Sequence, residues 1–337
     1  MHSWVRRWWA GEGGGLGKLA NGAMAPAEWA YLAVTEARNR AYDREWLNAT
    51  QAPIPVISVG NLAVGGSGKT PFAAWLAARL ARWGRAPAMV LRGYGDDEVL
   101  LHRELNPTVP VFTGRKRALA VHQAAAAGCD VAILDDGFQH RALKRDLNMV
   151  LVAAHGWTAK RRLLPRGPWR ESTRALRRAD VAVVIRRAVK ESGAVSAEIR
   201  KAAPSVLLVE CAVTPGALVP LHGGEPAHES SLRGSSVLGV ASLADPRPFA
   251  AHLQEFADAV EMAAFPDHYP FRAVDADRLR ARAAGRPLIM TRKEAVKLRP
   301  LVSSDEAAFV LYQRVEITSG AEELDAAIRR VLGGESS

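Results

Sequence analysis

The segment VGNLAVGGSGKTP, residues 59–71, restricts the possible folds of this chain more than any other part of it. It joins an apolar run, PVISVGN, to PFAAWLAARLARWG, which has helical periodicity. A glycine-rich turn between a buried strand and a helix directs backbone N–H groups and the positive end of the helix dipole toward phosphate. We therefore predict a loop that binds the phosphates of ATP, formed by Val64, Gly65, Gly66, Ser67, Gly68, Lys69 and Thr70.

Two side chains of this loop have predicted chemical roles. Lys69 is expected to bridge the β- and γ-phosphates of ATP, and Thr70 to offer its hydroxyl to Mg²⁺. The most common spacing of such loops has glycine at position 63, where this chain has Ala63. The loop of this chain instead fits the compact variant GGxGKT, with GGSGKT at residues 65–70.

The order of apolar runs predicts an α/β fold. Near-continuous apolar strands alternate with helical segments from residue 55 to residue 213, which is typical of a parallel sheet covered on both faces. Residues 214–234 are rich in Gly, Pro and Ser and suggest a linker or an irregular hairpin. Strand and helix patterns then resume and end in a helix near residues 321–332, whose placement is open. We expect a P-loop NTPase-type domain over residues 1–212 and a smaller α/β domain over residues 213–337 that completes an active-site cleft.

Acidic and polar residues follow the strand VAIL. Asp135 and Asp136 stand at its carboxyl end, where an acid can hold Mg²⁺ beside a phosphate loop. Neighbouring residues of a strand point to opposite sides, so one acid is expected to face the metal and the other to position a neighbour. Further polar residues at the expected strand ends are candidate substrate contacts: Asn61, Arg92, Tyr94, Gln139 and His140.

The net charge of the chain and the composition of its N-terminal segment indicate which kinds of molecule it could bind. The net charge of +10 indicates phosphate in some form, whether nucleic acid, anionic lipid or a phosphorylated substrate. A helix is predicted near residues 27–47, and Trp4, Trp8, Trp9, Trp29 and Trp46 alternate with arginines around it. This suits a membrane interface, or alternatively a helix docked on the core with its indoles packed. No apolar run reaches 18 residues, and Cys129 and Cys211 are expected to be buried reduced thiols.

The motifs together resemble the tetraacyldisaccharide 4′-kinase family. VGNLAVGGSGKTP, LRGYG, DDEVLL, LDDGFQHRALKRD, LLPRGPWRE, FPDHYPF and TRKEAVKL occur in the family's order over residues 25–300. The resemblance implies two α/β/α domains. It also implies transfer of the ATP γ-phosphate, with Mg²⁺, to the 4′ hydroxyl of a tetra-acylated glucosamine disaccharide 1-phosphate. This reaction takes place in lipid A biosynthesis, at the cytoplasmic face of the bacterial inner membrane. A peripheral monomer without a nucleic-acid partner is expected.

The resemblance also implies residue roles. Asp97 matches the family's catalytic acid, with Asp96 as the competing alignment, and His268 matches its partner. Such a pair can take a proton from an attacking hydroxyl. Arg170 in LLPRGPWRE is a candidate for the sugar phosphate or the transferred phosphoryl group. The chain has Thr291, Arg292, Lys293 and Glu294 where the family has Thr-Glu-Lys-Asp, a segment that the analogy places near the nucleotide base.

Two other classes of protein share the phosphate loop. One is a switch or partition-type ATPase, although partition ATPases have Lys where this chain has Val64. A GTPase is disfavoured because no N-K-x-D motif occurs. The other is a nucleic-acid-binding ATPase, which the basic clusters at residues 115–117, 160–162 and 177–178 would suit. These clusters lack interleaved aromatic residues except Trp169, and they suit an anionic membrane equally well.

Overall fold

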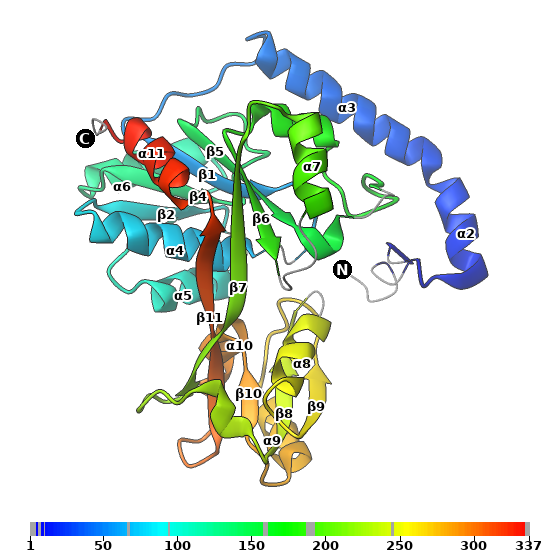
Figure 1. Cartoon of the computed structure of the whole chain (residues 1–337), viewed down its shortest axis with the longest axis vertical. Helices are drawn as coiled ribbons and strands as arrows, with labels where there is room; N and C mark the ends of the chain where they lie inside the picture. Colours follow the sequence, from blue (N-terminus) through cyan, green and yellow to red (C-terminus); the bar gives the residue numbers. More distant parts are fainter. Residues whose placement is uncertain are drawn as a thin grey trace. The chain divides into compact units, whose positions relative to one another are not determined.

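The computed structural model describes residues 5, 8–9, 11–65, 68–93, 95–157, 161–186, 193–243 and 246–333, without the side chains of residues 96, 155 and 229. It divides into two compact units (Figure 1). The larger unit comprises residues 2–93, 106–213 and 315–337. The smaller unit comprises residues 94–105 and 214–314.

The larger unit is built on a parallel sheet. Its strands lie in the order β3-β2-β4-β1-β5-β6-β7, and β11 follows β7. The strands are β1 (Val56–Asn61), β2 (Pro87–Leu91), β3 (Val111–Thr113), β4 (Val131–Asp135), β5 (Leu147–Ala153), β6 (Val181–Arg186), β7 (Leu207–Pro220) and β11 (Ala308–Ser319). The helices are α2 (Gly14–Ala23), α3 (Ala25–Asp43), α4 (Lys69–Arg82), α6 (Arg117–Ala126), α7 (Gly193–Ala202) and α11 (Ala321–Val331). Short 3-10 turns are η1 (Ala154–Gly156) and η2 (Thr173–Arg178).

The central strands of this sheet are buried along their whole length, as their apolar sequences predict. Every residue of β1, β2 and β4 is buried, which requires cover on both faces. Val56 and Leu134 pack with Val121 of α6 in one core cluster. A second cluster joins Val150 and Val184 to α7 and to Trp169. The predicted α/β fold is confirmed.

The smaller unit has a parallel sheet of its own order, β11-β10-β8-β9. Its elements are α5 (Asp96–Leu105), η3 (Glu229–Leu232), β8 (Ser236–Ala241), α8 (Arg247–Gln254), β9 (Ala259–Ala264), α9 (Ala273–Ala283), β10 (Leu288–Met290) and α10 (Arg292–Leu298). Its core has two clusters, one around Leu238, Leu279 and Leu298 and one around Val237, Leu253 and Ile289.

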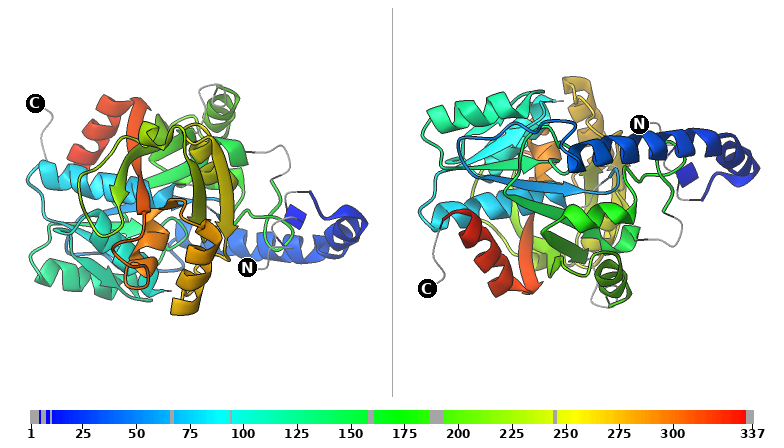
Figure 2. Two further views of the ribbon diagram at one scale, coloured as in Figure 1. Left: turned by 90° about the horizontal axis from the view of Figure 1, so that it is seen from below. Right: turned by 90° about the horizontal axis from the view of Figure 1, so that it is seen from above.

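The units are not continuous in sequence, in contrast to the expected division at residues 212–213. The chain passes from the larger unit to the smaller one within β7 and returns within β11. α5 belongs to the smaller unit, where Glu104 pairs with Arg299 at 2.7 Å. The C-terminal helix α11 belongs to the larger unit and lies beside α4, with Asp325 paired to Arg79 (Figures 1 and 2).

Residues 214–234 contain a strand and a hairpin. β7 continues to Pro220, and Leu218 and Ala227 exchange backbone hydrogen bonds of 2.7 and 2.8 Å. Of the two alternatives for this segment, the irregular hairpin is the one observed. Pro215 is tolerated because β6 pairs with β7 only as far as Ala212, so the ladder on that side has already ended.

The N-terminal helices α2 and α3 project past the sheet of the larger unit (Figure 2). α3 spans Ala25–Asp43, so it starts and stops slightly earlier than the helix predicted over residues 27–47. None of its residues is buried. Among the described residues, no helix is long and apolar enough to cross a membrane.

Candidate active site

The predicted phosphate-binding loop leads from β1 to α4. Gly68 has φ of 77°, a left-handed conformation that glycine adopts without steric cost, and it caps the N-terminus of α4. Lys69 and Thr70 are the first two residues of that helix, so their backbone N–H groups lie at its positive end. Gly66 and Ser67, also predicted to bind nucleotide, lie outside the described residues.

A second segment pairs with this loop. Val64 N–H donates to Pro168 O at 2.7 Å, and Arg170 N–H donates to Leu62 O at 2.7 Å. Ala63 and Trp169 form the antiparallel bridge between these two hydrogen bonds. Ala63 therefore has an extended backbone, and its φ is not positive. The lack of the usual glycine at position 63 costs nothing here, because any residue can adopt this conformation.

The acidic turn after β4 lies against the end of β1. Gly137 N–H donates to Val59 O at 3.1 Å. A Cβ atom on Gly60 would lie 2.7 Å from the backbone nitrogen of Phe138, so only glycine permits this approach. Asp135 is the last residue of β4 and is buried, whereas Asp136 has φ of 53° in the turn itself. The two carboxylates differ in exposure, since the Asp136 side chain is 39% exposed.

The carboxylate of Asp136 contacts two cations. Arg170 Nη1 donates to both of its oxygens at 2.8 Å, and Lys69 Nζ lies 3.5 Å from Oδ1. Burial opposes ionisation of this group, but the charges of Lys69 and Arg170 prevail and lower the pKa of Asp136. The structure thus brings together Lys69, Asp136 and Arg170, which lie far apart in the sequence.

Gln139 links this cluster to the end of β1. Arg170 Nη1 donates to Gln139 Oε1 at 3.2 Å, and Gln139 Nε2 donates to the carbonyl of Asn61 at 2.8 Å. Arg38 of α3 donates to the carbonyl of Gln139 at 2.8 Å. Asn61, Gln139 and Arg170 are therefore neighbours at the carboxyl edge of the sheet.

His140 stands in a basic environment. Burial, followed by the charges of Arg117, Arg145, Arg38 and Arg92, lowers its pKa to about 4. The imidazole is neutral at pH 7, and the surrounding guanidinium groups favour an anion at this place. Arg92 itself is exposed just after β2, and Tyr94 lies outside the described residues.

Helix α3 holds the segment that carries Arg170, a contact that sequence analysis did not predict. Tyr31 donates its hydroxyl hydrogen to the carbonyl of Arg170 at 3.1 Å, and Asn39 Nδ2 donates to Glu171 at 2.9 Å. Glu28 accepts from the backbone of Leu163 at 2.7 Å. No local pattern signals these pairs, because their partners are more than 130 residues apart.

The smaller unit carries a hydrogen-bonded acid and imidazole. His268 Nδ1 lies 2.8 Å from Asp97 Oδ2. The Asp97 side chain is 12% exposed and the His268 side chain 47% exposed, so the imidazole is open to solvent and the acid behind it is not. The side chain of Asp96, the competing candidate, is not described. The predicted pair is adjacent, and its chemical role stays a prediction.

A lysine that sequence analysis did not single out, Lys297, lies beside this pair, with its Nζ 3.9 Å from Asp97 Oδ2. Lys297 Nζ donates to Ser242 Oγ and to the carbonyl of Tyr269, each at 3.1 Å. Glu294 is fully buried and accepts from the Ser242 N–H at 2.8 Å and from its hydroxyl at 2.7 Å. In the same segment, Thr291 caps α10 by accepting from the N–H of Lys293.

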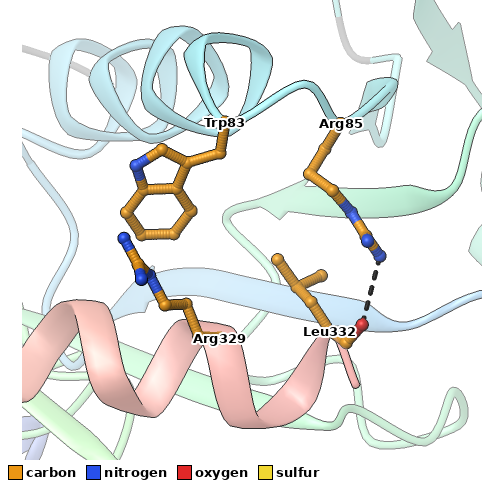
Figure 3. Close-up of a pocket in the computed structure, with 4 residues that line it drawn as sticks. All are labelled: Trp83, Arg85, Arg329 and Leu332. Carbon is orange, nitrogen blue, oxygen red and sulfur yellow. Dashed lines mark hydrogen bonds between the residues drawn. The ribbon is translucent and has the colours of Figure 1, made fainter. Parts of the chain in front are cut away.

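A shallow hollow of about 320 Å³ lies between α4 and α11, lined by Trp83, Arg85, Arg329 and Leu332 (Figure 3). Arg85 donates to the carbonyl of Leu332 at 3.2 Å. Trp83 follows the C-terminal end of α4, about 20 Å along the helix from Lys69. This hollow is therefore not part of the phosphate loop. Among the residues that the structure describes, no group of three or more His, Cys, Asp and Glu side chains could hold a metal ion.

A glycine-rich turn that leads from a buried strand into a helix beginning with Lys and Thr, with an acid at the end of the neighbouring parallel strand, is typical of P-loop nucleotide-binding proteins. The chain belongs to the tetraacyldisaccharide-1-phosphate 4′-kinase family, whose model matches residues 20–98 and 95–333. It is therefore a kinase.

Individual relatives agree with this assignment. The chain is 38% identical to tetraacyldisaccharide 4′-kinase of Halorhodospira halophila, covering 92% of each protein, and 37% identical to that of Anaeromyxobacter dehalogenans, covering 95% of this chain and 93% of the relative. Among solved structures, it resembles LpxK from Aquifex aeolicus in complex with ATP. The TM-score is 0.75 and the identity 28%, over 93% of this chain and 99% of the other.

Proposed function

We propose that this protein transfers the γ-phosphoryl group of ATP to the 4′ hydroxyl of a tetra-acylated glucosamine disaccharide 1-phosphate, acting as a monomer. The observation that carries the proposal is the hydrogen bond of 2.8 Å between Asp97 and His268, in a chain of this kinase family that also has the phosphate loop. The rival ATPase functions require no such acid–imidazole pair.

The chain's residues divide the work of this reaction. The N–H groups at the start of α4 and the ammonium of Lys69 bind the ATP phosphates. Arg170, oriented by Asp136, stabilises charge on the transferred phosphoryl group or binds the sugar phosphate. The basic residues around His140 favour the substrate's phosphate. Asn61, Gln139, Arg92 and Tyr94 complete the proposed substrate contacts.

Asp97 and His268 act on the acceptor hydroxyl. With Nδ1 toward Asp97, the imidazole has Nε2 left to accept the hydroxyl proton. The hydroxyl oxygen then bonds to the γ-phosphorus as the bond from that phosphorus to the β–γ bridging oxygen breaks, and ADP leaves. The Asp97 carboxylate orients the ring and stabilises the imidazolium that forms.

Residues suited to Mg²⁺ are present at the phosphate loop. Mg²⁺ in such enzymes takes one or two protein oxygens in addition to phosphate oxygens and water, so a cluster of three acids is not needed. Thr70 is the second residue of α4, and Asp135 ends β4, the strand beside β1, and both side chains offer oxygen atoms. We assign these two residues to Mg²⁺, which would neutralise phosphate charge. Asp136 would serve the metal only if it released Lys69 and Arg170.

The N-terminal helices support action at a membrane surface, which we place at the cytoplasmic face of the inner membrane. Leu16, Leu19, Trp29 and Val34 are each about 70% exposed on α2 and α3. Two of the tryptophans make internal hydrogen bonds, and two are exposed. Trp8 is buried and donates to Gly17 O, and Trp9 donates to Pro165 O, whereas Trp29 and Trp46 are exposed. Trp4 lies outside the described residues. Exposed indoles and aliphatic side chains suit lipid headgroup depth.

The test is incubation of the purified protein with γ-labelled ATP, Mg²⁺ and the tetra-acylated disaccharide 1-phosphate in mixed micelles. Label is expected in the lipid, and Lys69→Ala is expected to abolish it. ATP hydrolysis without labelled lipid would contradict the proposal in favour of an ATPase.

A further inference from the structure

Two lysines of α10 contact the segment around His268. Lys293 Nζ lies 2.6 Å from Asp267 Oδ1, and Lys297 Nζ donates to the carbonyl of Tyr269 at 3.1 Å. Residues four apart on a helix lie on the same face, so the two ammonium groups reach the residue before His268 and the residue after it. His268 is thus held from both sides through its neighbours.

The backbone of His268 needs such support. Its φ is 58°, in the left-handed region, which costs a non-glycine residue about 1 to 2 kcal/mol. The turn has one backbone hydrogen bond of its own, from Tyr269 N–H to Pro266 O at 3.1 Å. The lysine contacts fix the same turn from outside, and so fix the direction in which the imidazole projects.

Lys297 also faces Asp97. Its Nζ lies 3.9 Å from Asp97 Oδ2, the same oxygen that His268 contacts. Both side chains of this ion pair are only 12% exposed, so water screens the pair weakly.

The charged groups around Lys297 come from three elements. They are Glu294 and Lys293 on α10, Asp97 on α5, and Asp267 in the turn. Burial lowers the pKa of Lys297, while Glu294 and Asp97 oppose that effect. Ser242, which donates to Glu294 and accepts from Lys297, fixes the ammonium in place.

We propose that Lys297 is a positioning residue for the Asp97–His268 pair, holding the Asp97 carboxylate with its charge and the His268 backbone through the carbonyl of Tyr269. This inference rests on the proposed function of that pair. The nearby cation also offsets the charge of Asp97, so the imidazole can give up its proton again after each turnover.

The experiment compares the whole protein with its Lys297→Met and Lys297→Gln variants in the lipid phosphorylation assay. Methionine preserves much of the length of the side chain without charge, and glutamine retains hydrogen bonding without charge. We expect kcat to fall about 10- to 100-fold in both, with the KM for ATP within about twofold of wild type. Arg278→Met is the matched control, because Arg278 belongs to the same unit and is 76% exposed.

The pH profile separates positioning from a merely structural role. Without the Lys297 cation, a protonated imidazole beside Asp97 is favoured. The acidic limb of the pH profile of kcat/KM should therefore move to higher pH by about 0.5 to 1 unit. In a double-mutant cycle, Lys297→Met should slow the Asp97→Asn variant much less than it slows wild type.

The outcomes distinguish this inference from the function on which it rests. If Asp97→Ala and His268→Ala lose activity while Lys297→Met keeps kcat and an unmoved acidic limb, this inference is overturned and the proposed function stands. Additive effects of Lys297→Met and Asp97→Asn would also overturn it. If Asp97→Ala and His268→Ala both remain fully active, the proposed function of the pair fails first.

Discussion

Arg170 donates from a single nitrogen, Nη1, to both carboxylate oxygens of Asp136 at 2.8 Å, across 34 residues of sequence. The same carboxylate faces Lys69 at 3.5 Å. The acid thus sets the positions of two cations at the phosphate loop. In the absence of a nucleotide it also partly neutralises them.

Asp136→Asn should show whether Asp136 acts by orienting Lys69 and Arg170 or by changing the affinity for ATP. Asparagine has nearly the same shape but cannot hold both cations by charge, so we expect kcat to fall about 10- to 100-fold. The KM for ATP should stay the same or decrease, because a negative charge near the phosphates is removed. Steady-state kinetics against ATP checks this. Asp43→Asn, which removes a 60% exposed acid paired with Arg141, is the control and should match wild type.

The lowered pKa of His140 predicts how the stability of the folded chain depends on pH. Its pKa is lowered to about 4 in the folded state, against an ordinary value near 6.5. Between these values the unfolded chain binds the proton and the folded chain does not. The free energy of unfolding should therefore fall as pH decreases through this window, by no more than about 3 kcal/mol. His140→Gln should flatten this part of the profile in urea denaturation at pH 5 and pH 7. An unchanged slope in the variant would show that His140 does not titrate as described.

The C-terminal helix α11 is expected to be held by Asp325. Its carboxylate pairs with Arg79 of α4, both side chains being less than a third exposed, and Arg79 in turn lies over Trp75 and Trp83. Asp325→Ala should lower the free energy of unfolding by about 1 kcal/mol and leave kcat unchanged. Thermal unfolding checks the first part, with Glu322→Ala on the first turn of α11 as the control. A loss of kcat at unchanged stability would show that α11 affects the reaction.

Exposed apolar residues on α2 and α3 should control binding to lipid. Replacing Leu16 and Trp29 by serine removes apolar side chains that are about 70% exposed. We expect affinity for anionic vesicles to fall about 5- to 50-fold, with the melting temperature unchanged. Vesicle sedimentation measures this, and Leu119→Ser, another exposed apolar site on α6, serves as the control. Equal binding by all three proteins would exclude α2 and α3 as the lipid-contacting surface.

The parts of the fold that depend on local pattern were predictable from sequence. Continuous apolar runs identified the buried strands β1, β2 and β4, and the glycines before Lys69 located the start of α4. The LLPRGPWRE segment was assigned near the substrate by resemblance alone. Its pairing with Leu62 and Val64 depends on backbone hydrogen bonds between distant residues, which leave no periodic signal.

The missed features share the same physical cause. β7 runs through Pro215 because one of its edges is unpaired there, a fact that only the sheet order reveals. Lys297 contacts Asp97 and the carbonyl of Tyr269, although nothing in its own segment signals either partner. Tertiary contacts, not local propensity, decide both.

Single-turnover transfer by His268→Ala tests the central claim most directly. Enzyme in excess over labelled lipid substrate would be mixed with saturating ATP and Mg²⁺, and His122→Ala, an exposed histidine of α6, would serve as the control. The account predicts that His268→Ala slows phosphoryl transfer by about 100-fold or more while nucleotide affinity stays within twofold. Transfer by His268→Ala at the rate of wild type and of His122→Ala would contradict it.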